Sequence, residues 1–144
     1  MKSQLSFDSL VILGWYDGVT VGIGETNRTY HLIVLIAWKM TADETYKISA
    51  LFPINEVDAD ALQGSAVDDP KEDSVAFNQR LESFLSICPT GAYLTRTPAE
   101  EDKIIEVIWL SEFNAADLLP YDDDRIFFDE QNFARWDHYF RKNT

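Results

Sequence analysis

The sequence predicts an α+β domain: a mostly antiparallel sheet that begins as an N-terminal β meander, with two main helices packed on one face. Three observations support this. Four strand-like segments fill the first 52 residues, a segment with helical periodicity follows in the middle, and a second one closes the chain. The resulting order, β-β-β-β-α-β-β-α, is typical of the α+β class. The 144 residues fit a single domain spanning 1–144, since domains usually contain about 100–200 residues.

The first two strands are expected at residues 9–16 and 19–23. Asp17-Gly18 lies between them and is typical of a type I′ hairpin turn, in which both central residues need a positive φ. In the second strand Val and Ile alternate with Thr and Gly, as in a strand with one buried face. A further turn is expected at residues 25–28.

The next two strands are expected at residues 29–38 and 45–52. The first is apolar on both faces, which is typical of a central strand covered on both sides. Pro53 is expected to end the pairing of the second, because proline has no N–H to donate to a neighbouring strand. One face of that strand carries Tyr46, Ile48, Ala50 and Phe52.

After a loop, a helix is expected to begin at Asp69. Asp69 suits the N-cap, Pro70 suits the first helical position, and Glu72 completes the capping pattern. Pro89 ends this helix, because the residue before a proline disfavours the helical conformation. The apolar stripe of the helix consists of Phe77, Leu81, Phe84, Leu85 and Cys88.

Two strands, a helical turn and a second helix follow. The strands are expected at residues 91–97 and 103–110, and the turn at 113–119. Asp129 can cap the C-terminal helix. The apolar stripe of this helix consists of Phe133, Trp136 and Phe140.

The charge is distributed unevenly along the chain. There are 25 acidic and 12 basic residues, which gives a formal net charge of −13. Residues 51–124 hold 17 of the acids and four of the bases, so the imbalance falls in this segment. Such a chain lacks the basic face of a nucleic-acid binder. Acidic loops that share one side would attract a basic partner, whereas scattered acidic loops would only keep the protein soluble.

Composition excludes several other classes of protein. The longest apolar run, residues 32–38, is far shorter than the ~20 residues of a membrane-spanning helix. Asp8 interrupts the apolar stretch that a signal peptide needs, so we expect a cytoplasmic protein. The single cysteine, Cys88, excludes an internal disulfide and a cysteine-built zinc site.

No cofactor or metal motif is present in the sequence. The glycines at 22 and 24 lack the third glycine and the strand–helix setting of a dinucleotide loop, so they are interpreted as turn or bulge residues. The acids at 56, 58 and 60 have the spacing that opens an EF-hand loop. However, Ala61 and Val67 occupy the positions that need Gly and Glu. We therefore expect neither a cofactor nor a metal.

Nucleophilic catalysis is also not indicated, because it needs a nucleophile with a base within reach. Cys88 lies on an apolar stripe, where a free cysteine behaves as a small buried hydrophobe. His31 opens an apolar strand and is interpreted as a structural histidine with satisfied hydrogen bonds. His138 is expected to face solvent. A carboxylate-based enzyme stays open, since the sequence does not reveal how far apart the carboxylates lie.

Two acidic segments are the predicted partner-binding sites. In residues 121–125 an aromatic residue is joined to a run of acids on an expected loop, which is the composition of a binding hot spot. The second segment, residues 100–102, is a run of three acids. The predicted partner-binding residues are Tyr121, Asp122, Asp123, Asp124, Glu100, Glu101 and Asp102.

These observations favour a small acidic binding protein without enzymatic activity. Its most concrete form is an inhibitor or immunity-type factor that engages a basic protein partner, such as a nuclease-type toxin, through acidic loops in residues 51–124. Two alternatives stay open. One is a structural subunit that self-associates as a homo-oligomer through an apolar edge or face. The other is a small-ligand-binding or enzymatic domain with a pocket of carboxylates and aromatic residues.

Overall fold

The computed structural model describes eight segments of the chain, and every structural statement below concerns these residues. The segments are 8–15, 19–26, 29–40, 45–65, 75–88, 90–98, 106–118 and 130–142.

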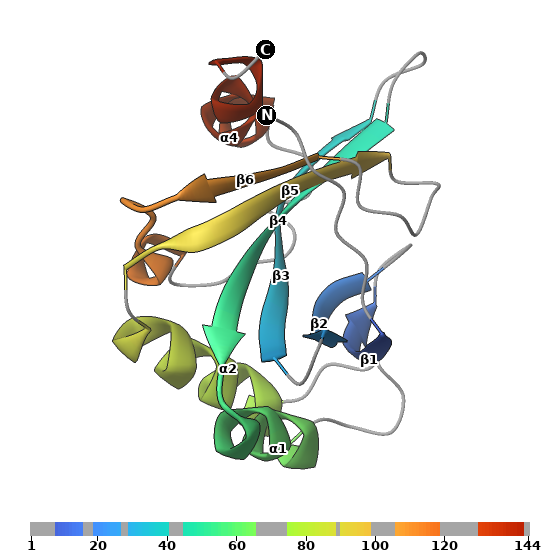
Figure 1. Cartoon of the computed structure of the whole chain (residues 1–144), viewed down its shortest axis with the longest axis vertical. Coiled ribbons are helices and arrows are strands. Elements are labelled where there is room, and N and C mark those ends of the chain that lie inside the picture. Colours follow the sequence, from blue (N-terminus) through green and yellow to red (C-terminus); the bar gives the residue numbers. More distant parts are fainter. Residues whose placement is uncertain are drawn as a thin grey trace.

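Six strands and four helical segments make up the described structure (Figure 1). The strands are β1 (Ser9–Trp15), β2 (Val19–Thr26), β3 (Thr29–Met40), β4 (Thr45–Ile54), β5 (Ala92–Pro98) and β6 (Glu106–Leu110). The helical segments are α1 (Glu56–Ser65), α2 (Val75–Ile87), the 3₁₀ helix η1 (Ala115–Leu118) and α4 (Glu130–Lys142).

The strands form one sheet in the order β1-β2-β3-β4-β5-β6, and every neighbouring pair is antiparallel. Each strand therefore pairs with the next one along the chain, as in a meander. The predicted fold class, an α+β domain with a mostly antiparallel sheet, is confirmed. The helix that was expected from Asp69 to Pro89 is present as α2 from Val75 to Ile87, and residue 69 lies outside the described residues. The expected C-terminal helix and the turn at 113–119 are present as α4 and η1.

Two predictions about the strands were wrong. The turn expected at residues 25–28 begins later, because Glu25 and Thr26 still belong to β2. Pro53 does not end the pairing of β4, since it lies opposite His31 of β3. The pairing of β4 with β5 ends at Leu51, so Pro53 has a neighbouring strand on one side only. A proline without an N–H is tolerated in such an edge position.

Helix α1 differs from the sequence-based expectation of a loop at these residues. Asn55 caps this helix: its Oδ1 accepts a hydrogen bond from the backbone N–H of Asp58 at 2.7 Å. Glu56 and Asp58 lie in the first turn, where negative charge is favourable. Ala59 and Leu62 are buried, so the helix is held by one narrow apolar face. The spacing considered above for an EF-hand loop therefore belongs to a capped helix.

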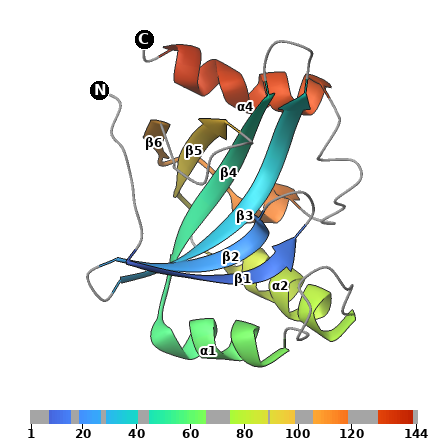
Figure 2. The ribbon, with the colours of Figure 1, turned by 90° about the vertical axis from the view of Figure 1, so that its right-hand side faces the viewer.

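A bulge in β3 lies where this strand contacts α4. The pairing of β3 with β4 shifts between Leu35 and Ala37, which leaves Ile36 without an opposing residue. The backbone oxygen of Ile36 accepts a hydrogen bond from Nδ2 of Asn132 at 2.7 Å. Figure 2 shows α4 across one end of the long strands β3 and β4, while α1 and α2 lie toward their other end.

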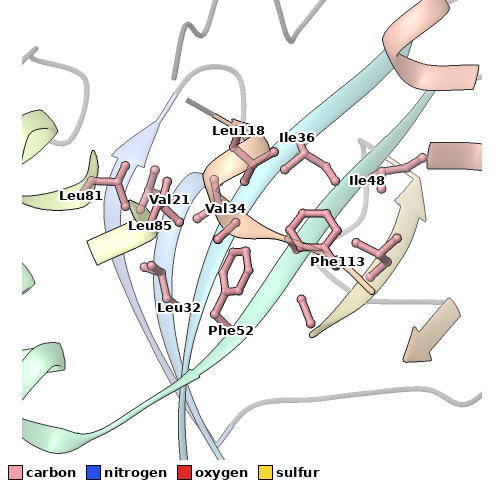
Figure 3. Packing of buried hydrophobic residues seen from close by; sticks show 14 of the residues in the cluster. Val21, Leu32, Val34, Ile36, Ile48, Phe52, Leu81, Leu85, Phe113 and Leu118 are labelled. Atoms are coloured by element: carbon pink, nitrogen blue, oxygen red, sulfur yellow. The ribbon is translucent and has the colours of Figure 1, made fainter. Parts of the chain in front are cut away.

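One hydrophobic core joins the sheet to all four helical segments. Figure 3 shows side chains from the strands, α2 and η1 converging in this cluster. The opposite face of β3 is also buried, since Ile33 and Leu35 are 9% and 0% exposed. The expectation that this strand is covered on both sides is therefore confirmed. The largest side chains below 2% exposure include Phe52, Phe140, Leu32, Leu35 and Ile36.

Candidate functional site

The predicted partner-binding residues, at 100–102 and 121–124, lie outside the described residues. The same holds for the predicted caps at Asp69 and Asp129. Their roles stay predictions. Two surfaces built from described residues carry the charged chemistry of the molecule instead. Both include a residue of β3 (Thr29–Met40), one near the start of this strand and one near its end.

The first surface, which we call the α1 acidic surface, surrounds Tyr30 at the start of β3. It consists of Tyr30, Glu25, Glu56, Val57 and Asp60. Glu25 pairs with Tyr30 across the sheet, and Glu56 and Asp60 come from α1. The pKa of the Tyr30 phenol is raised, first by the negative charge of Glu25, then by burial, and then by Glu56 and Asp60. Three carboxylates from two elements thus converge on one tyrosine.

Further contacts complete this surface. Oγ of Ser9 donates a hydrogen bond to Oε2 of Glu25 at 3.3 Å, and the backbone N–H of Asp8 donates to the backbone oxygen of Glu25 at 2.8 Å. The backbone of Asp8 therefore lies beside that of Glu25. Val57 is 76% exposed and lies between Glu56 and Asp58 in α1. The surface thus combines a half-buried tyrosine, an exposed apolar side chain and several acids.

The second surface, which we call the α4 cleft, lies between the C-terminal helix and strands β3, β4 and β5. Its volume is about 270 Å³. Phe133 forms an apolar part of its wall, and Nζ of Lys39 lies 5.9 Å from the centre of that ring. The lining residues are Lys39, Tyr46, Arg96, Phe133, Asp137 and Arg141.

Arg96 is the centre of the α4 cleft. Its two terminal nitrogens donate to Oδ1 of Asp137 and Oε1 of Glu106, each at 2.6 Å. The guanidinium carbon lies 5.4 Å and 5.3 Å from the ring centres of Tyr46 and Phe140. Burial opposes the charge of Arg96, but the hydrogen bonds to Glu106 and Asp137 outweigh it and raise the pKa of the guanidinium. Arg96 therefore stays charged while it ties α4 to β5 and β6.

Asp137 completes the network. Burial would raise the pKa of its carboxyl, but hydrogen bonds from Arg141 and Arg96 outweigh burial and lower it. Nε of Arg141 donates to Oδ2 of Asp137 at 2.7 Å. Both oxygens of Asp137 thus accept a charge-assisted hydrogen bond, and its side chain is only 7% exposed.

The α4 cleft could have been found from two sequence signals. Arg96 lies two residues after Leu94, in the buried phase of its strand, and Asp137 follows Phe133 by four residues on the buried stripe of its helix. A cation and an anion on two apolar faces indicate a buried ion pair. The α1 acidic surface gives a weaker signal, since it depends on a helix that the sequence did not predict.

The predictions for the two histidines had different outcomes. His138 is exposed, as expected, and its Nδ1 lies 2.7 Å from the backbone oxygen of Arg135. His31 was predicted to have satisfied hydrogen bonds, but its buried Nδ1 has no hydrogen-bond partner within the described ranges. Burial lowers the pKa of His31. The ring of Tyr93 lies edge-on to His31, with the ring centres 6.3 Å apart.

Neither an activated cysteine nor a metal site is found among the described side chains. Burial raises the pKa of the Cys88 thiol, which is opposite to the shift of an activated nucleophile. No group of three or more His, Cys, Asp or Glu residues there is placed to hold a metal ion. The helices in the described segments are too short or too polar to cross a membrane.

Comparison with known proteins assigns no relative: no family model, no curated protein and no solved structure matches this chain.

Proposed function

We propose that this protein is a non-enzymatic binding protein that engages a basic protein partner through acidic surface groups. The observation that supports the proposal is that the negative charges of Glu25, Glu56 and Asp60 all act on the Tyr30 phenol, with Glu25 paired to Tyr30 across the sheet. The net charge of −13 adds a long-range field of the same sign.

The α1 acidic surface has the composition that such an interface needs. Carboxylates steer a basic partner during diffusion and set its orientation, while apolar anchors supply most of the lasting affinity. Tyr30 and Val57 are the apolar anchors. Tyr30 is half-buried, and Val57, next to Glu56 in the sequence, is 76% exposed. The predicted acidic segments at 100–102 and 121–124 would extend the same field.

The partner class follows from charge. A nuclease-type enzyme carries a cationic cleft for phosphates, so an acidic domain can occupy that cleft and block it. An inhibitor or immunity-type factor is therefore the concrete form of the proposal. It acts in the cytoplasm, where it would meet such an enzyme.

The test begins with a tagged protein as bait in lysate of its source cell, eluted by a salt gradient. A basic protein that is released by moderate salt is then purified, and its association rate constant is measured at low and high ionic strength. We expect this rate constant to fall at high salt, because exposed charges are screened. A salt-independent association, or recovery of no basic protein, would refute the proposal.

A matched pair of variants locates the interface. The triple variant Glu25→Gln, Glu56→Gln, Asp60→Asn removes three charges from the α1 acidic surface and should slow association about tenfold or more. The control Glu82→Gln, Glu112→Gln, Asp117→Asn also removes three negative charges, but from residues that do not contribute to the raised pKa of Tyr30. Equal effects of the two triple variants would show that only net charge matters and would contradict this surface.

A second candidate function is self-association through β1. This strand is at the edge of the described sheet, and its consecutive residues Leu10, Val11 and Ile12 are 46%, 39% and 38% exposed. Edge strands with exposed apolar side chains pair readily with another strand, and an antiparallel pair of two β1 strands would be self-complementary. Sedimentation that gives a monomer at high protein concentration would exclude this function.

A further inference from the structure

Trp109 in β6 is far more exposed than the other tryptophan side chains that the structure describes. Trp38 and Trp136 are 3% and 5% exposed, whereas Trp109 is 52% exposed. Tyr93 of β5 lies directly opposite Trp109 in the sheet and is 37% exposed. We call these two residues the aromatic pair. Because an aromatic side chain has about 150–250 Å² of surface, the pair leaves roughly 200 Å² open to solvent.

The rings of the aromatic pair are held in place by the protein. Their centres are 4.9 Å apart and their planes make an angle of 63°, which is an edge-to-face arrangement. The indole of Trp109 also lies against Gly91, where a Cβ would be only 2.8 Å from Cζ2 of the indole. A side chain that is already fixed loses little freedom when a partner binds to it. The aromatic pair is therefore suited to anchor a partner.

The aromatic pair lies at the same end of the sheet as the α1 acidic surface. Along β4, Tyr93 lies opposite Leu51, and Tyr30 of the acidic surface lies opposite Ile54. These two positions are three residues apart, which is about 10 Å along a strand. The ring of His31, the residue after Tyr30, is also in edge-on contact with Tyr93. One partner can therefore reach both places, since a typical interface covers about 800 Å² on each protein.

The aromatic pair lacks a contact that the two buried tryptophans have. Nζ of Lys47 lies 4.8 Å from the ring centre of Trp38, and the guanidinium carbon of Arg135 lies 4.4 Å from that of Trp136. Within the described ranges, no lysine or arginine lies over either ring of the aromatic pair. An aromatic face attracts cations, and tryptophan does so most strongly. The net charge of −13 favours the approach of such a cation from outside the chain.

We propose that the aromatic pair receives an arginine side chain of the basic protein partner, with its guanidinium stacked on Trp109. The inference rests on the proposed function, which supplies the basic partner. Arginine fits better than lysine, because its flat and weakly hydrated guanidinium stacks on aromatic rings. Tryptophan, tyrosine and arginine are also the residues most enriched in binding hot spots. The aromatic pair would thus slow dissociation, while the α1 acidic surface speeds association.

The first experiment is an NMR titration of the ¹⁵N-labelled protein with a short glycine peptide that carries two arginines. The same peptide with citrulline in place of arginine is the reference, because citrulline keeps the shape of the side chain and removes its charge. We expect a saturable shift of the indole N–H of Trp109 with the arginine peptide only. No saturable shift at Trp109, or equal shifts with both peptides, would overturn the inference.

Variants of Trp109 test whether the ring itself binds the peptide. Trp109→Leu should weaken binding of the arginine peptide about threefold to fivefold, and Trp109→Phe should weaken it less, because the smaller ring still attracts a cation. Ile87→Ala is the control: it shortens an apolar side chain of α2 that is 81% exposed, and it should leave the affinity unchanged. Thermal melts check that each variant is folded. An affinity of Trp109→Leu or of Trp109→Phe equal to that of the wild-type protein would overturn the inference.

The purified basic partner separates this inference from the proposed function. Trp109→Leu should raise the dissociation rate constant about threefold or more and leave the association rate constant unchanged. A salt-dependent association together with an unchanged dissociation rate constant would overturn the arginine contact and leave the proposed function standing. A response of Trp109 to the arginine peptide, without recovery of any basic protein, would refute the proposed function and support a ring site for cations.

Discussion

Replacing Arg96 by methionine tests the energetic centre of the α4 cleft. The side chain of Arg96 is 16% exposed, and its two carboxylate partners, Asp137 and Glu106, are 7% and 12% exposed. Arg96→Met keeps the apolar length of the side chain between Tyr46 and Phe140 but leaves two buried carboxylates without their shared cation. Removing one partner from a buried ion pair costs about 3–5 kcal/mol.

The matched control is Arg141→Gln. Arg141 binds the same carboxylate at 2.7 Å, but its side chain is 70% exposed. Exposed pairs four residues apart in a helix contribute only about 0.3–0.5 kcal/mol, because water screens them. The two arginines share Asp137 as a partner, but Arg96 is buried and also binds Glu106, so the comparison separates the buried network from the exposed ion pair.

Urea unfolding followed by tryptophan fluorescence measures both variants. Trp136 is a suitable reporter, since it is 5% exposed and its ring centre lies 5.1 Å from that of Phe113. For a domain of this size, the expected loss in Arg96→Met corresponds to a fall in melting temperature of about 10–15 °C. If the free energies of unfolding of Arg96→Met and Arg141→Gln agree within about 1 kcal/mol, the reasoning about the buried network is refuted.

The pH dependence gives a second check on the same network. The pKa of Asp137 is lowered in the folded protein from its ordinary value of 3.8, so this carboxyl contributes stability that is fully present above pH 3.8. That contribution is lost as the pH falls through the folded pKa. The difference in unfolding free energy between the wild-type protein and Arg96→Met should therefore narrow below pH 3.8. A constant difference down to the acid transition would contradict this account.

Three further predictions concern single residues. Burial lowers the pKa of His31 from 6.5, so the unfolding free energy of the wild-type protein should fall as the pH drops below 6.5. In thermal melts, His31→Gln should not show the part of this fall that comes from protonation of His31. Gly91→Ala should destabilise by about 1–3 kcal/mol in urea unfolding, because φ is +109° and the new Cβ would lie 2.8 Å from Cζ2 of Trp109. Gly64→Ala should instead stabilise by about 0.5–1 kcal/mol, since nothing lies within 4 Å of the new Cβ in α1; a loss of stability there would contradict the helical setting of Gly64.

Local patterns were sufficient for most of the fold. The alternation in residues 19–23 and the doubly apolar run at 29–38 correspond to β2 and β3, and the stripe that begins at Phe77 corresponds to α2. Each of these signals is contained within one element. Helix α1 was missed because only Ala59 and Leu62 bury apolar surface, while its many acids resemble those of a loop. Its N-cap, Asn55, was the remaining local signal.

The sequence by itself determined the class of fold, the uneven charge and the lack of a recognisable catalytic motif, because these depend on composition and on spacing within single elements. Only the tertiary structure decided which charges meet. Arg96 and Asp137 are 41 residues apart, and Glu25 and Glu56 converge on Tyr30 only through strand pairing and the start of α1. Coulomb interactions and hydrogen bonds depend on distance and burial in space. For that reason the net charge alone could predict neither the acids that act on Tyr30 nor the buried ion pairs of Arg96.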